Sequence, residues 1–264
     1  MKVLKAMQSA LKHTITGRHS PASRFIILGR SRTGSNLLRG LLNDHSRVTV
    51  FEEVFKNENL IHWGLPGYDQ SKNILEKFQN DPCSFLEKVI FGDHPVRVSA
   101  VGFKLFYYHA QAGKLQPIWT YLQEHQDIKV LHIKRQNILR THLSKKRAEL
   151  TDRWINLSGE TQEAKPVALD YEECLADFEQ TRAWETGFTQ FFGRHPQMEV
   201  VYERLAVDHR GVMSEVFEFL GVPPEPVAPQ TYKQGGQPLS RAISNFGELK
   251  ERFAGTPWES FFEE

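Results

Sequence analysis

The segment 24–38, RFIILGRSRTGSNLL, constrains the fold of this chain most. An apolar run is followed by a turn rich in glycine, serine and arginine, and then by the start of a helical pattern. A strand that leads through such a turn into a helix directs several backbone N–H groups, and the positive end of the helix dipole, at one point. Because this point suits a phosphate or a sulfate, the segment predicts an anion-binding site.

The spacing of the glycines is that of a nucleoside-triphosphate loop, but the lysine of that motif is missing. Gly29 and Gly34 are placed as in the P-loop, which then requires Lys followed by Ser or Thr, whereas residues 35–36 are SN. The positive charges lie inside the loop instead, at Arg30 and Arg32. Guanidinium groups match oxyanions with two parallel hydrogen bonds and stay charged. We expect the chain to bind an anionic nucleotide, with Arg32 folded over it, and not to hydrolyse ATP or GTP. Arg30 could either contact the anion or face solvent.

Composition bounds the remaining possibilities. With 264 residues, of which 40% are hydrophobic, the chain is long enough for one large α/β domain, which we place at residues 22–264. The 33 basic and 32 acidic residues nearly balance, which argues against a nucleic-acid partner. Cys83 and Cys174 show no metal-ligand or disulfide spacing, so a reducing, cytoplasmic location is expected. No apolar run approaches the roughly 20 residues of a transmembrane helix.

Residues 1–21 form a basic N-terminal segment. Val3, Leu4, Met7 and Leu11 recur at helical spacing, but the segment lacks the continuous apolar centre of a secretory signal. A helix docked on the domain and a segment with weak membrane-surface contact or a targeting role both fit this pattern.

Short apolar runs alternate with helical patterns along the rest of the chain. This alternation predicts a three-layer α/β fold in which helices flank both faces of a central parallel sheet. We expect strands at 24–29, 47–51, 100–106, 128–134 and 198–202. We expect helices at 35–44, 72–91, 111–125, 136–150, 171–193, 209–220 and 245–254, with loops at 151–170 and 226–243.

A second group of polar residues follows the strand at 128–134. Arg135 lies where doubly wound sheets bind ligands, at the carboxyl end of a parallel strand, and Ser144 lies on the following helix. Arg135 can meet Ser144 if it precedes the helix and reaches along it. A basic, solvated helix explains the same residues equally well.

Carboxylates follow the strand at 47–51. Glu52 and Glu53 are adjacent, so in a continuing strand their side chains point to opposite faces and only one can face a cleft. A carboxylate beside a phosphate loop is well placed to take a proton from a bound hydroxyl. Among the other polar residues, His132 is expected in the core, and Trp63 and Trp154 could line an acceptor pocket. No histidine spacing indicates a metal site.

Together these segments resemble the sulfotransferases that use 3′-phosphoadenosine 5′-phosphosulfate (PAPS), and in particular the bacterial branch of that family. RSRTGSNLL resembles the family's 5′-phosphosulfate loop, and KRQNILRTHLS resembles its 3′-phosphate motif. Glu53, followed by VF, is similar to the Glu-x-Phe element that supplies the catalytic carboxylate in the bacterial branch. The C-terminal stretch from residue 232 resembles the region in which a basic, glycine-containing loop closes over the nucleotide.

The resemblance implies a P-loop-like fold and in-line transfer of a sulfuryl group from PAPS, without a metal, to a hydroxyl of a small-molecule, sugar or lipid acceptor. Glu53, rather than Glu52, would act as general base, and Lys104 would contact the sulfate or the acceptor. Arg135 and Ser144 would bind the 3′-phosphate. The residues implied at the 5′-phosphosulfate and in the closing loop are Arg30, Arg32, Thr33, Gly34, Ser35, Asn36, Leu37, Lys233, Gln234, Gly235 and Gly236.

Two other functions are compatible with a phosphate loop. A kinase acting on a small molecule would need a lysine after Gly34 and an aspartate at a strand end for magnesium, and neither is evident. An inactive nucleotide-binding relative would not need to keep both Arg32 and Glu53.

Overall fold

The structure is a computed structural model that describes residues 18–19, 23–68, 70–152, 165–230 and 237–263. Of the basic N-terminal segment it therefore describes only Arg18–His19, which form a short strand, β1, antiparallel to β4 (His94–Pro95). The helix considered for the rest of that segment lies outside the described residues.

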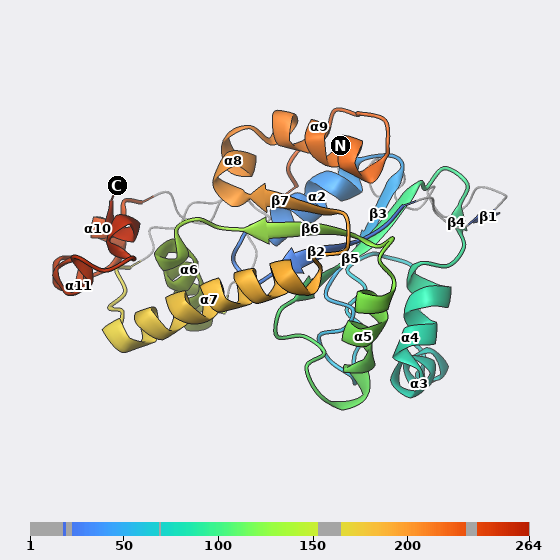
Figure 1. Cartoon of the computed structure of the whole chain (residues 1–264), viewed down its shortest axis with the longest axis horizontal. Coiled ribbons are helices and arrows are strands. Elements are labelled where there is room, and N and C mark those ends of the chain that lie inside the picture. The colour runs from blue at the N-terminus through green and yellow to red at the C-terminus, as the bar shows by residue number, and fades with distance from the viewer. Residues whose placement is uncertain (1–17, 20–22, 69, 153–164, 231–236, 264) are drawn as a thin grey trace.

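A five-stranded parallel sheet forms the centre of the molecule (Figure 1). Its strands are β2 (Ser23–Gly29), β3 (Val48–Phe51), β5 (Ala100–Phe106), β6 (Lys129–Lys134) and β7 (Gln197–Val201). Their order is β3-β5-β2-β6-β7, and every pairing is parallel. The chain first builds the sheet to one side of β2 and then returns to build the other side. The carboxyl end of β2 therefore lies at the point where the strand order reverses, which is where doubly wound sheets bind ligands.

Helices cover both faces of this sheet, as expected for a three-layer, P-loop-like fold (Figure 1). The helices of the described residues are α2 (Ser35–Asp44), α3 (Lys72–Asn80), α4 (Pro82–Phe85), α5 (Pro117–Glu124), α6 (Ile138–Thr151), α7 (Tyr171–Phe191), α8 (Tyr202–Val207), α9 (His209–Leu220), α10 (Leu239–Ala242) and α11 (Phe246–Phe253). A π-helical turn, η1 (Leu86–Ile90), and two 3₁₀ turns, η2 (Gly113–Leu115) and η3 (Glu259–Phe262), complete the described elements.

All five expected strands are present, but the expected helix at 72–91 is wrong. Helix α3 ends at Asn80, a new helix starts at Pro82, and the backbone of Asp81 between them is not helical. Proline has no N–H to continue the helix, and the Asp81 side chain accepts from the Ser84 N–H, capping the next one. The expected loop 226–243 likewise contains a short helix, α10.

The two faces of the sheet have separate hydrophobic cores because side chains alternate along each strand. Phe25 and Ile27 of β2 pack with α2 and α9, whereas Ile26 and Leu28 pack on the opposite side with α3, α4 and α5. All four side chains are fully buried. This packing fixes β2, and with it the turn at its carboxyl end.

A third apolar cluster lies beyond the carboxyl ends of the strands. It joins α6 and α7 to the C-terminal elements α10, α11 and η3, at the left of Figure 1, where the strand arrowheads point. Phe178 of α7 and Phe253 of α11 are fully buried in it. The cluster holds α6 against the edge of the sheet where β2 ends.

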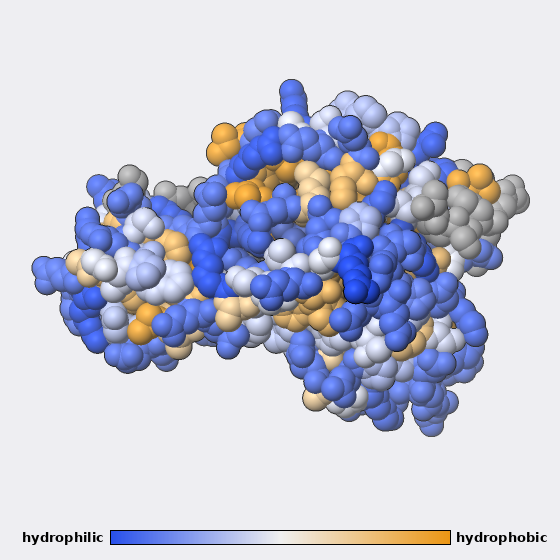
Figure 2. Space-filling view, viewed as in Figure 1, coloured by the Kyte–Doolittle hydropathy of each residue, from blue (hydrophilic) through white to orange (hydrophobic). Residues whose placement is uncertain are grey.

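The molecular surface is mainly hydrophilic on the face drawn in Figure 2, and its apolar side chains lie in separate small groups. No helix among the described residues is long and apolar enough to cross a membrane. Cys83 and Cys174 are both free thiols.

Candidate active site

The turn after β2 forms a concave backbone surface in front of helix α2. Arg32 and Gly34 both have left-handed backbone conformations, with φ of 69° and 89°, and α2 starts at Ser35. The N-cap residue is Gly34, which has no side chain to cap the helix, and the first turn contains no acidic residue. The first N–H groups of α2 thus point out of the turn with no capping side chain of their own, as an anion site requires.

Tyr202, at the carboxyl end of β7, forms the floor beneath this turn. A Cβ atom added to Gly34 would overlap the Tyr202 ring, so only glycine fits both the backbone conformation and the space. The guanidinium of Arg135 also lies against this residue, 4.7 Å from the centre of the Tyr202 ring. Tyr202 escaped the sequence analysis, although its position directly after a strand was a usable signal.

Arg32, Arg135 and Ser144 come together at this turn. The Arg32 Nε–H donates to the Ser144 Oγ across 2.9 Å, and an Arg135 N–H donates to the Arg32 carbonyl across 3.2 Å. Burial lowers the pKa of both arginines, and the repulsion of Arg135 lowers that of Arg32 further. Two partly desolvated guanidinium groups that repel each other favour an anion between them.

Arg30 does not contribute its charge to this cluster. Its side chain is buried, at 3% exposure, and forms a 3.0 Å ion pair with Asp177 and a hydrogen bond with Thr181, both on α7. His142 of α6 shares the same carboxylate at 3.0 Å. Arg30 thus fastens the turn to α7, and it does not face solvent.

The other predicted loop residues are mostly internal. The Thr33 hydroxyl donates to the Arg30 carbonyl across 2.8 Å, Ser35 is buried, and Leu37 packs with the core cluster beneath α2. These three therefore offer their backbone N–H groups rather than their side chains. Lys233, Gln234, Gly235 and Gly236, expected in the closing loop, lie outside the described residues, as does Trp154.

Lys104 of β5 connects the turn to the two adjacent glutamates. Its ammonium group, which is almost completely buried, donates to the Asn36 side chain at 2.5 Å and pairs with both Glu52 and, at 3.2 Å, Glu53. Strand β3 ends at Phe51, so the alternation expected for Glu52 and Glu53 does not continue. The two carboxylates converge on one lysine, contrary to the expectation that only one would face the site.

Glu53 is also close to His109, which the sequence could not connect to any partner. The His109 Nε2 lies 3.8 Å from a Glu53 oxygen, and the Phe106 N–H donates to its Nδ1 across 3.2 Å. That hydrogen bond makes Nδ1 an acceptor, so the neutral ring carries its proton on Nε2, towards Glu53. Burial lowers the pKa of His109 to about 4, which keeps the ring neutral.

The charge state of Glu53 follows from its surroundings. Burial alone would raise the pKa of its carboxyl, but the positive charges of Lys104 and Lys56 outweigh this effect, and the pKa lies below its usual value. Glu53 is therefore an ionised carboxylate at neutral pH, and it is linked to the start of α2 through Lys104.

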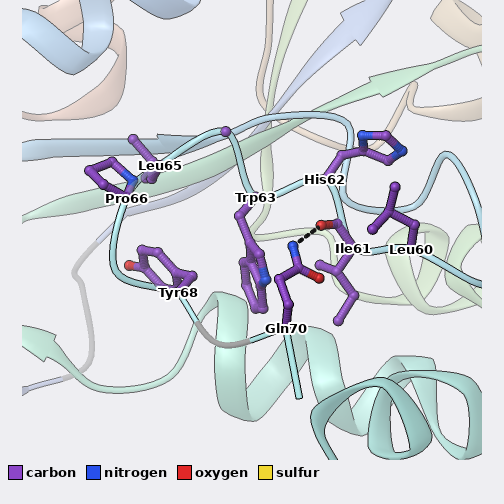
Figure 3. Close-up of a pocket in the computed structure, with 9 residues that line it drawn as sticks. Leu60, Ile61, His62, Trp63, Leu65, Pro66, Tyr68 and Gln70 are labelled. Carbon is purple, nitrogen blue, oxygen red and sulfur yellow. Dashed lines mark hydrogen bonds between the residues drawn. The ribbon is translucent and has the colours of Figure 1, made fainter. Parts of the chain in front are cut away.

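Figure 3 shows a cavity of about 410 Å³. One of its lining residues, Gly64, lies against the Glu52 side chain. The cavity is open to the surface and is lined by residues of one segment, 60–70, in which the Gln70 amide donates a 2.7 Å hydrogen bond to the Ile61 carbonyl. Trp63, which the sequence analysis suggested for an acceptor pocket, is a lining residue of this cavity, but most of its ring is buried in the core. His132 is buried as expected, 2.6 Å from the Tyr107 hydroxyl.

Comparison with known proteins identifies the family of this chain. Nodulation protein H from Rhizobium tropici is 27% identical over 243 residues, covering 90% of this chain and 92% of that protein. Nodulation protein H from Rhizobium meliloti (strain 1021) is 26% identical over 249 residues, covering 92% and 96%.

Solved structures of sulfotransferases are also similar. The sulfotransferase from Alicyclobacillus acidocaldarius is 19% identical with a TM-score of 0.49, and covers 91% of this chain and 94% of its own. The sulfotransferase domain from the curacin biosynthetic pathway is 17% identical with a TM-score of 0.44, covering 92% and 90%. The sequence profile of the Sulfotransferase family matches residues 24–226, the part that carries β2 to α9 and all the site residues described above. The chain therefore belongs to the sulfotransferase family.

Proposed function

We propose that this protein transfers the sulfuryl group of PAPS to a hydroxyl of a small-molecule, sugar or lipid acceptor, with Glu53 as general base. The observation that carries the proposal is that a buried cation, Lys104, contacts the N-terminal turn of α2 and at the same time pairs with an ionised carboxylate, Glu53. The cation and the turn suit the anionic donor, and the carboxylate suits the acceptor proton.

The described residues fit the two phosphate groups of such a donor. The N–H groups of Thr33 to Leu37, with Arg32, would hold the 5′-phosphosulfate at the N-terminus of α2, where no side chain caps the helix. Arg135 and Ser144 would bind the 3′-phosphate. Their direct contacts with Arg32 support two adjacent phosphate sites, as the two phosphates on one ribose would require.

The reaction needs no covalent intermediate with the protein. The S–O bond to the 5′-phosphate breaks while a new S–O bond forms to the acceptor oxygen, whose proton passes to Glu53. Arg32 and the N–H groups of the turn would stabilise the negative charge that the leaving phosphate gains, and Lys104 would stabilise charge on the transferred group. The positive charge needed is thus supplied by side chains and a helix terminus. Among the described residues, no three His, Cys, Asp or Glu side chains are grouped as a metal site.

A kinase is the main competing function on a fold of this kind. Ser35 and Asn36 follow Gly34 in place of the lysine and hydroxyl residue that bind a triphosphate and its magnesium. This difference favours PAPS as the donor. A cytoplasmic location is part of the proposal, based on the two unpaired cysteines.

The test is a transfer assay with PAPS labelled in its sulfate. The purified protein would be incubated with labelled PAPS and extracts of the organism that makes it, and labelled products would be separated and identified. The proposal predicts an enzyme-dependent labelled product that does not form with Glu53→Gln. Label transfer from the γ-phosphate of ATP, with none from PAPS, would support the kinase instead.

A further inference from the structure

Glu52 contacts three parts of the candidate site: helix α2, strand β5 and the segment 60–70. A solvated surface carboxylate would not make these contacts. We infer that Glu52 is a positioning residue that fixes the cavity segment 60–70 relative to helix α2, and that this cavity holds a neutral hydroxyl compound, the acceptor. The inference rests on the proposed function and specifies which acceptor class it uses.

The side chain of Glu52 joins two cations from different elements. One oxygen pairs with Lys104 of β5, and the other pairs with Arg39 of α2 at 3.0 Å. Lys104 in turn binds Asn36 at the start of α2. Glu52 is thereby linked to α2 by two separate paths. One runs through Lys104 to Asn36, and the other is the direct ion pair with Arg39.

The main chain of Glu52 fixes the cavity segment. The Glu52 N–H donates to the Trp63 carbonyl across 2.8 Å, and the Glu52 carbonyl accepts from the Lys104 N–H at 3.2 Å. Arg39 completes the link, because its guanidinium donates to the Gly64 carbonyl while it pairs with Glu52. Arg39 therefore binds both Gly64, which lines the cavity, and Glu52, which precedes the candidate base Glu53 in the chain.

Gly64 shows how close this approach is. Its φ is 64°, and a Cβ atom there would overlap both the Glu52 side chain and the Arg39 guanidinium. A residue with a side chain would be strained at this φ and would force the link apart. Because Gly64 has no side chain, the segment 60–70 can pack directly against the Glu52–Arg39 ion pair.

The cavity is of ligand size and its chemistry selects a class of acceptor. Its volume of about 410 Å³ lies within the range of small-molecule sites. Its described lining residues include no lysine or arginine, and Arg39 is already paired. An anionic acceptor would find no fixed positive charge there, so the lining favours a neutral alcohol or sugar.

Hydrogen–deuterium exchange with adenosine 3′,5′-bisphosphate as the probe tests the link without an acceptor. If Glu52 and Arg39 couple α2 to the cavity, the bisphosphate should slow exchange in peptides covering residues 60–68 of the unsubstituted protein. Glu52→Gln and Arg39→Gln should each remove this protection while calorimetry shows bisphosphate affinity within about twofold. The double variant should behave like either single variant, because both substitutions break one link.

Arg24→Gln is the matched control. Arg24 also pairs with two carboxylates, at 3.1 Å and 2.6 Å, but at the opposite end of β2. It should lower stability slightly and leave the protection of residues 60–68 intact. Protection that is equal in all five proteins, or absent from the unsubstituted protein although the bisphosphate binds, would overturn the inference and leave the proposed function standing. Failure of the bisphosphate to bind at all would overturn both.

Steady-state kinetics with the acceptor found by label transfer supplies a second, independent test. Glu52→Gln should raise the acceptor KM by about tenfold or more while the KM for PAPS changes by less than about twofold, a split that a general loss of folding would not produce. An acceptor that carries a negative charge before sulfation, or equal changes in both KM values, would contradict the inference.

Discussion

Arg32 and Ser144 form a direct hydrogen bond, 2.9 Å long, between the turn after β2 and the middle of α6. The two residues are 112 positions apart, and the third apolar cluster holds α6 in place for this contact. Because Arg135 binds the carbonyl of the same arginine, the groups proposed for the two phosphates form one continuous site. Substitutions in this site should therefore change nucleotide affinity, whereas substitution of the candidate base Glu53 should change the rate of transfer.

Glu53→Gln should abolish transfer but not donor binding. The amide keeps the size of the side chain but cannot accept the acceptor proton, a loss worth about a hundredfold or more in rate. We expect calorimetry to give a bisphosphate affinity within about twofold of the unsubstituted value. Glu76→Gln on the exposed face of α3 is the control and should leave both quantities unchanged. Normal turnover of Glu53→Gln would assign the base to another residue.

Arg135→Ala should weaken adenosine 3′,5′-bisphosphate far more than adenosine 5′-monophosphate. A hydrogen bond to a charged group contributes about 1.5–3 kcal/mol, so a loss of roughly tenfold to a hundredfold is expected for the bisphosphate alone. Arg204→Ala, which removes a surface pair with Glu215, should change neither affinity. Equal losses for both nucleotides would refute a specific contact with the 3′-phosphate.

Gly34→Ala should eliminate nucleotide binding and destabilise the fold. The left-handed backbone costs an alanine about 1 kcal/mol, and the added methyl group overlaps the Tyr202 ring as well. Gly67→Ala separates these effects, because Gly67 has a similar φ of 83° but no atom within 4 Å of its Cβ position. The control should show only the backbone cost in a denaturant titration. Similar losses in both variants would mean that the contact with Tyr202 is unimportant.

Acidification should destabilise the protein through buried neutral histidines. Burial lowers the pKa of His109 to about 4 and that of His132 to about 3, from an ordinary value of 6.5. Between these values the unfolded chain binds more protons than the folded one, so the free energy of unfolding falls as the pH falls from about 6.5 towards 4. The loss should be on the order of 2–3 kcal/mol per histidine.

Denaturant titrations at several pH values would check this effect, with His132→Gln as the comparison. Glutamine can still accept from the Tyr107 hydroxyl, but it does not titrate. The variant should therefore lose less stability than the unsubstituted protein over the same pH range. Identical pH dependence in the two proteins would show that His132 does not contribute.

Much of this architecture could be predicted from the sequence. The strands are short runs of apolar, often β-branched residues, and the turn at 30–34 has a composition that few other structures explain. Strand ends also located Arg135 and the Glu52–Glu53 pair correctly, because parallel strands present their carboxyl ends at one edge. The expected helix at 72–91 was wrong, although Pro82 signalled its break, and the expected loop 226–243 contains the short helix α10.

The contacts between distant side chains could not be predicted in this way. Arg30 is committed to Asp177, a partner 147 positions away, and no local pattern distinguishes this pairing from an anion contact. Lys104 of β5 contacts Asn36, Glu52 and Glu53. These residues come from α2 and from the chain after β3, and they meet at Lys104 because β5 lies between β3 and β2 in the sheet. Such three-dimensional convergence follows from tertiary packing rather than from periodicity.

Calorimetric titration of the purified protein with adenosine 3′,5′-bisphosphate, and separately with ATP and magnesium, tests the central claim most directly. The turn at 30–34 together with Arg135 should bind the bisphosphate tightly without any metal and bind ATP at least about tenfold more weakly. Tight, magnesium-dependent binding of ATP with no heat from the bisphosphate would contradict the proposed donor and the site built around it.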